Sequence, residues 1–247
     1  MDSAILAELL RADFLPTAYL APRETRELRE FMRARLFLVA MRTRAKNRIH
    51  AILWKHGKQS PNTDLFGKTG SEFLSKQILS TVYRDELDSL LRTVRFLESE
   101  VKLMDKEIAR RAKLDGQAQL LMSMPSIGPF TALMIQAEVG DFSRFASPEK
   151  LACYSGLIAS SRSSGGKLRF GHITRQGSPY LRYVMVEAAT RVKPRRGPLY
   201  EFFDHLKERK GVKTARVALA RKMLTILWHM VNKSEPFRIG DSGGVKR

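Results

Sequence analysis

Apolar residues recur every three or four positions along most of the chain, which is the spacing of an amphipathic helix. The pattern predicts helices over residues 3–12, 23–56, 71–113, 178–192 and 214–231, with a further helix beginning at Ser147–Pro148. Glycine- and proline-containing connectors separate them, the longest at 57–70. Strand-like sequence is confined to short pieces around 168–173. The predicted fold class is therefore mainly α.

An apolar seam runs along the later part of the 71–113 helix. Its members alternate by three and four residues, as the a and d positions of a heptad do: Leu87, Leu90, Val94, Leu97, Val101, Met104 and Ile108. Two partners fit this seam. One is the 23–56 helix of the same chain, which would give a long helical hairpin; the other is a second chain, which would give a coiled coil and a homo-oligomer. Three heptads do not distinguish them.

The segment 120–142 has a different pattern. Gly128 suits a tight turn, Pro129 suits the first position of a helix, and an apolar helical run follows. This order is typical of a helix-hairpin-helix element, whose turn offers backbone N–H groups to a phosphate. Gly128 is therefore a candidate for nucleic-acid contact, although the pattern is also common as structure alone.

The charge balance indicates a polyanionic partner. Lys and Arg number 44 against 25 acidic residues, giving a net charge of +19, and residues 157–247 hold 20 basic and 6 acidic residues. Nucleic acid is the leading candidate, and an anionic membrane surface is the alternative. Basic residues of the 23–56 helix and of the 193–200 turn are candidates for binding phosphate: Arg44, Lys46, Arg48, Arg195 and Arg196.

Membrane and secreted classes fit poorly. There is no apolar run of about 18 residues, no signal-peptide pattern, and no long cationic helix with aromatic residues on its opposite face. The single cysteine, Cys153, excludes an internal disulfide and suits the cytoplasm, and we expect it to be a small buried residue.

The stretch "SRSSGGKLRFGHITRQG", residues 161–177, combines hydroxyls, bare backbone and cations. Gly165 and Gly166 remove side chains where a phosphate backbone must approach, while Lys167, Arg169 and Arg175 would neutralise its charge. A serine hydroxyl held there, from Ser163 or Ser164, could attack phosphorus if it were activated. Spacing alone leaves a basic loop that only binds phosphate as the simpler interpretation.

A family resemblance strengthens the catalytic interpretation. "PSIGPFTALMIQAEVGDFSRFASPEKLACYSGLIASSRSSGGKLRFGHITRQGSPYLRYVMVEAA" closely resembles the C-terminal domain of Piv/MooV-like transposases and invertases, the bridge-RNA-guided recombinases of the one-ten insertion-sequence family. "DSAILAELL", "RELREFMRARLFLVAMRTRAKNRIHAILWKHG" and "TDLFGKTG" are similar to the middle region of that family, and "ARKMLTILWHMV" with "EPF" to its closing helix. The resemblance spans essentially the whole chain.

The resemblance implies an active site in two parts. A RuvC-like domain supplies four acidic residues, Asp-Glu-Asp-Asp, that bind Mg2+, and the C-terminal domain supplies a serine. By spacing Ser163 matches that serine best, with Ser164 next, upstream of an "I-[ST]-K-x-G" element in which Arg175 replaces lysine. Asp2 matches the final acid, and Ser126 stands where the family usually has glycine.

The other three acids would lie before Met1, so the resemblance predicts an N-terminally truncated chain or a start placed at an internal methionine. The expected domains are a remnant of the RuvC-like domain over 1–15, a helical coiled-coil region over 16–115 and the transposase domain with its serine loop over 116–247. The predicted function is serine attack on DNA with RNA-guided strand exchange, incomplete in this chain, with DNA, a guide RNA and further subunits as partners. The alternatives are a non-catalytic nucleic-acid-binding remnant that regulates the intact transposase and a helix-hairpin-helix repair or structural protein.

Overall fold

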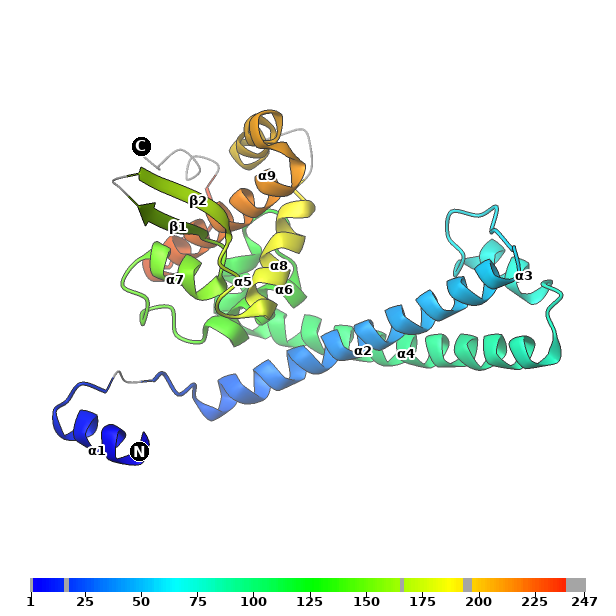
Figure 1. Ribbon diagram of the computed structural model, residues 1–247, viewed down its shortest axis with the longest axis horizontal. Coiled ribbons are helices and arrows are strands. Elements are labelled where there is room, and N and C mark those ends of the chain that lie inside the picture. Colours follow the sequence, from blue (N-terminus) through cyan, green and yellow to red (C-terminus); the bar gives the residue numbers. More distant parts are fainter. Residues whose placement is uncertain (1, 16–17, 165–166, 193–196, 239–247) are drawn as a thin grey trace.

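The computed structural model describes residues 2–15, 18–164, 167–192 and 197–238 and shows a long two-helix arm joined at one end to a compact helical domain (Figure 1). The mainly α prediction is confirmed. The helices are α1 (Asp2–Arg11), α2 (Arg23–Lys55), α3 (Lys68–Ser75), α4 (Thr81–Leu114), α5 (Gly116–Met122), α6 (Pro129–Val139), α7 (Pro148–Ser155), α8 (Pro179–Thr190) and α9 (Pro198–Lys233). Within the described residues, strands occur only as the hairpin of β1 (Ala159–Ser164) and β2 (Lys167–Ile173).

Helices α2 and α4 form the arm, running side by side over most of their length (Figure 1). The predicted seam faces α2: five of its members are buried, namely Leu87, Val94, Leu97, Val101 and Ile108. Towards the far end of the arm, Leu87 and Val94 pack with Ala45, Ile49 and Leu53 of α2. Burying one such aliphatic side chain is worth about 1.5–3 kcal/mol. The seam therefore forms a helical hairpin within one chain.

Ion pairs between α2 and α4 also help to fix how the two helices are aligned along the arm. Arg35 Nε lies 2.9 Å from Asp105 Oδ1, and Lys46 Nζ lies 2.7 Å from Glu98 Oε1. Nearer the far end, Arg48 Nε lies 2.6 Å from Glu86 Oε1. Such partly exposed pairs stabilise by at most about 1 kcal/mol each, so apolar burial dominates the arm.

The prediction of one helix over 71–113 is wrong at its beginning. The chain forms the short helix α3, leaves helical geometry over residues 76–80 and starts α4 at Thr81. Leu65 and Leu74 are buried in the cluster at the end of the arm, which requires α3 to fold back onto α2 and α4. Arg84 holds the bend, because its Nη1 donates to the carbonyl oxygen of Leu74.

The compact domain is built around α6, whose residues are mostly buried. This helix packs against α2, α4, α5 and α8, so the arm and the domain share one core. Helix α9 begins at Pro198, earlier than the predicted residue 214, and its backbone leaves helical geometry at Gly211 (φ 77°). The 120–142 segment contains the end of α5, a turn with Gly128 half-buried before Pro129, and α6; its interpretation as a helix-hairpin-helix element stays a prediction.

Helix α1 differs from the rest because none of its residues is buried. Figure 1 shows it apart from the compact domain, before the start of α2. The connecting segment is anchored further on: Tyr19 accepts a hydrogen bond from the amide of Asp141 (3.4 Å), and the Arg144 guanidinium lies over the Tyr19 ring at 4.3 Å. None of the helices that the structure describes could span a lipid bilayer.

The turn before α6 explains why Ser126 is an unusual residue there. Its φ of +70° lies in the left-handed region, which costs a residue with a Cβ about 1–2 kcal/mol. We expect Ser126→Gly to raise the free energy of unfolding by about 1 kcal/mol, measured by urea denaturation. The control is Ser99→Gly in the helical backbone of α4, which should lower it by about 0.5 kcal/mol. A loss at both positions would contradict this account of the turn.

Candidate active site and nucleic-acid interface

The predicted serine loop is a β-hairpin. Its strands pair Ser161 with Phe170, Arg162 with Arg169, Ser163 with Leu168 and Ser164 with Lys167. Both candidate serines therefore lie on β1, at the end of the hairpin that projects from the helical domain (Figure 1). Gly165 and Gly166 lie outside the described residues.

The strand register decides which candidates share a face. Side chains alternate between the two faces of a strand, and directly opposed residues share one face. Ser163 is exposed and lies on the face of Ser161 and Phe170, whereas the exposed Arg169 lies on the other face. The hairpin therefore brings an aromatic ring, and not the guanidinium of Arg169, to the Ser163 face. For Ser164 and Lys167 the structure describes the backbone only.

The Ile173–Gly177 element fixes the base of the hairpin. The amide of Thr174 donates to Ile158 O (2.8 Å) and that of Arg175 to Gly156 O (3.3 Å). Arg175 itself is exposed and has a left-handed backbone (φ 55°). At Gly177 φ is 104°, and a Cβ there would overlap the carbonyl oxygen of Tyr154. Glycine is thus required where this turn closes onto α7.

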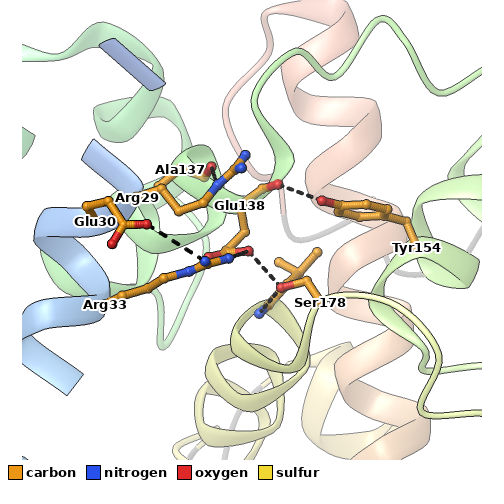
Figure 2. A network of polar contacts seen from close by, with 8 residues as sticks. Arg29, Glu30, Arg33, Ala137, Glu138, Tyr154 and Ser178 are labelled. Carbon is orange, nitrogen blue, oxygen red and sulfur yellow. Dashed lines mark hydrogen bonds and ion pairs between the residues drawn. The ribbon is translucent and has the colours of Figure 1, made fainter. Parts of the chain in front are cut away.

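A buried polar network lies directly behind this turn (Figure 2). Glu138 of α6 is only 1% exposed, and its two carboxylate oxygens accept hydrogen bonds from Arg33 Nε (2.9 Å) and Nη2 (3.1 Å). The hydroxyl of Ser178 donates to the same carboxylate (2.8 Å) and accepts from the amide of Leu181, which caps α8. Tyr154 of α7 donates to Glu138 O (3.2 Å). The carboxylate of Glu138 thus joins α6 to α2 and to the N-cap of α8, and its backbone carbonyl adds α7.

Arg33 connects this network to the arm. Partial burial disfavours its charged form, but hydrogen bonding and charge from Glu138 outweigh that, and the pKa of the guanidinium is raised. Its Cζ also lies 4.4 Å from the centre of the Tyr180 ring. One turn earlier, Arg29 donates to Ala137 O (3.0 Å). The sequence pattern did not predict these contacts; the one signal was Glu138 itself, an acid inside the apolar run 132–139.

The other basic residues proposed to bind phosphate differ in their exposure and in their partners. Lys46 and Arg48 form ion pairs across the arm with Glu98 and Glu86, and their contact with phosphate stays a prediction. Arg44 is exposed and lines a hollow with Phe37 and Tyr183. Arg195 and Arg196 lie outside the described residues. Arg44 thus differs from the other two positions proposed on α2, because it lies outside the ion pairs that the structure describes across the arm.

The predicted metal ligand does not belong to a ligand cluster. Asp2 is exposed in the first turn of α1. Among the described residues no group of three or more His, Cys, Asp or Glu side chains could hold a metal ion. Mg2+ needs several hard oxygen ligands, so the described residues do not by themselves fit this ion.

The structure also corrects the expectation for the single cysteine, Cys153. The prediction of a buried side chain is wrong, since Cys153 is exposed on α7 while its neighbours Leu151 and Ala152 fill the core.

Comparison with known proteins gives the family. The model of the "Transposase IS116/IS110/IS902 family" matches residues 118–203, and a DEDD-type transposase model of the IS110 group matches residues 1–56. The chain carries transposase domains of the IS110/IS116/IS902 family. The first of these transposase domains runs from α5 into α9 and includes the hairpin, the 173–177 turn and Glu138.

Curated relatives agree with these transposase domains. The chain is 25% identical over 232 residues to a "Probable family 20 transposase" of Pseudomonas aeruginosa, covering 88% of this chain and 67% of that protein. It is 26% identical over 232 residues to the "Transposase for insertion sequence element IS1111A" of Coxiella burnetii, covering 88% and 62%. Over 129 residues it is 33% identical to the "Pilin gene-inverting protein" of Moraxella bovis, covering 51% and 40%. The chain thus spans about two thirds of the length of the first two relatives.

Proposed function

We propose that this chain is the serine-bearing part of a DNA transposase and that Ser163 is its nucleophile. The observation that carries the proposal is the exposed position of Ser163 on a hairpin whose base is fixed to α7 and α8, inside the region that matches the transposase family. A nucleophile on a projecting ribbon can reach a phosphate in a nucleic acid, whereas one in the helical core could not.

The reaction is a transesterification. Ser163 Oγ forms a bond to phosphorus as the bond from phosphorus to one deoxyribose oxygen breaks. The hydroxyl proton passes to a base, and the leaving oxygen takes up a proton. The phosphoserine link preserves a phosphodiester, so that the free hydroxyl of another strand can reverse the step and complete strand exchange. Serine is a weak nucleophile at its ordinary pKa and requires electrostatic help. Arg175 at the hairpin base is one candidate for this help. Lys167 and Arg169 are the others, but they lie opposite Ser164 and Arg162, so they would have to reach the phosphate around the edge of the ribbon.

DNA is the proposed substrate, and a guide RNA is the proposed source of sequence choice. The net charge of +19 supports binding to phosphate backbones, which carries little sequence information by itself. In a complete enzyme Asp2 would be one of several carboxylates that hold Mg2+, with the further carboxylates and subunits supplied by other parts of the assembly.

The second candidate function is a non-catalytic nucleic-acid-binding regulator of an intact transposase. The net charge of +19 supports it, because reversible binding to phosphate backbones requires no catalytic group. Both candidates require binding to nucleic acid, and only the first requires covalent chemistry.

A chimera separates these functions. Residues 1–247 would replace the matching region of the P. aeruginosa transposase, and the product would be incubated with Mg2+, the proposed guide RNA of that element and its end DNA, nicked to trap intermediates. The proposal predicts a protein–DNA complex that survives denaturing electrophoresis. The regulator predicts only a reversible complex, which dissociates as salt rises. A chimera that binds this DNA but never yields the denaturation-resistant complex would overturn the catalytic proposal.

A further inference from the structure

A hollow of about 510 Å3 lies along β2 and the turn that follows it. Its lining includes Ser160, Arg169, Phe170, His172, Thr174 and Gln176. The hollow is distinct from the buried Glu138 network, which lies behind the turn. The chemistry of these lining side chains indicates which group the hollow would accommodate.

Phe170 gives the hollow an aromatic surface. It is 70% exposed and belongs to neither apolar cluster of the protein. Its strand partner is Ser161, so the residue opposite offers it no apolar contact. An exposed aromatic ring on a strongly basic protein is typical of surfaces that stack unpaired bases.

The edge of the hollow is polar. The Oγ1 atom of Thr174 is buried and has no hydrogen-bond partner among the described residues. His172 and Gln176 are exposed beside it and can each donate and accept hydrogen bonds. An aromatic face bordered by such groups matches a nucleobase, which has a π-face and donors and acceptors along its edges.

We propose that this hollow binds one unstacked nucleobase, that of a nucleotide adjacent to the phosphate attacked by Ser163. The location relative to that phosphate rests on the proposed function; the base-binding site itself does not. Ser163 and Phe170 share a face of the hairpin and are diagonal neighbours, a separation of about 7–8 Å in an antiparallel pair. A single strand that crosses this face can therefore place its phosphate at Ser163 and the neighbouring base on Phe170. A base inside a duplex has its faces covered by its neighbours and cannot use the site.

The test compares single-stranded and duplex DNA on the chain itself. Fluorescence anisotropy would measure the Kd of a labelled 12-nucleotide thymidine oligomer and of a labelled duplex of equal length. Phe170→Ala should weaken single-strand binding by about 5- to 150-fold, the loss expected for one stacked base. Phe170→Tyr, which keeps the ring, should retain nearly wild-type binding, and duplex binding should change less than about twofold in both variants.

Phe96→Ala is the matched control, because Phe96 is an aromatic residue 62% exposed on α4, away from the hairpin. It should leave both affinities unchanged, and circular dichroism would verify the folding of every variant. An equal loss on single strands and duplexes, or no larger effect of Phe170→Ala than of Phe96→Ala, would overturn the base-binding site. Neither readout depends on covalent chemistry, so a missing DNA adduct with an intact Phe170 effect would reject only the role of Ser163.

Discussion

Replacing Ser163 with alanine is expected to abolish the denaturation-resistant DNA complex of the chimera, while reversible DNA binding stays within about twofold of the unsubstituted protein. Alanine removes the oxygen that must form the bond to phosphorus, so no covalent product remains. The side chain is exposed on β1, and its loss leaves the core and the fixed hairpin base unchanged. Denaturing electrophoresis and anisotropy measure the two quantities separately.

Ser161→Ala is the matched control for this experiment. Ser161 is an exposed serine on the same face of the same strand, two residues nearer the helical domain. It should retain the covalent complex. Ser164→Ala tests the neighbouring candidate, and loss of the complex there, with its persistence in Ser163→Ala, would transfer the nucleophilic role to Ser164.

Arg33→Ala is expected to lower the free energy of unfolding by about 3–5 kcal/mol, several times the effect expected at Ser126. The change leaves the Glu138 carboxylate, 1% exposed, without its two guanidinium hydrogen bonds. Only the Ser178 hydroxyl would still donate to it. Urea denaturation measures the loss, and hydrogen exchange should show weaker protection at Thr174 and Ser178, whose amides hold the turn.

Two further variants test whether the lost contact with Glu138 causes the destabilisation by Arg33→Ala. Arg26→Ala, an exposed arginine on the same helix, should change the free energy of unfolding by less than about 0.5 kcal/mol. The double variant Arg33→Met with Glu138→Gln should recover much of the loss, because a neutral amide needs no counter-charge and can still accept from Ser178. If Arg33→Ala cost no more than Arg26→Ala, the network would not be what fixes the hairpin base to the arm.

The helical periodicity predicted the arm well because packing of α2 on α4 buries one continuous stripe, which the spacing of Leu87 to Ile108 already displays. It did not reveal the break between α3 and α4. That break depends on Leu74 entering the end of the arm and on Arg84 reaching its carbonyl group, both contacts across a bend. Local sequence continues to favour helix there, and the tertiary contact overrides it.

The candidate site was likewise only partly predicted by the sequence. The hydroxyls and cations of 161–177 and the strand-like sequence around 168–173, which forms β2, were identified from the sequence. The partner strand β1 was not, because it lacks the apolar alternation that usually marks a strand. Two glycines between short segments were the available hint. The face shared by Ser163 and Phe170 depends on register, and the pairing of Glu138 with Arg33 joins residues 105 positions apart. Likewise, composition does not reveal that Lys46 forms an ion pair with Glu98 across the arm.

The position of the phosphorus–protein bond is the most direct test of the account. Trypsin would cleave the covalent complex of the chimera after Arg162 and Lys167, releasing the five-residue peptide 163–167. After nuclease digestion, mass spectrometry should find this peptide carrying one nucleotide remnant, and fragmentation should place it on the first serine, Ser163. A remnant on Ser164, or on any residue outside this peptide, would contradict the central claim.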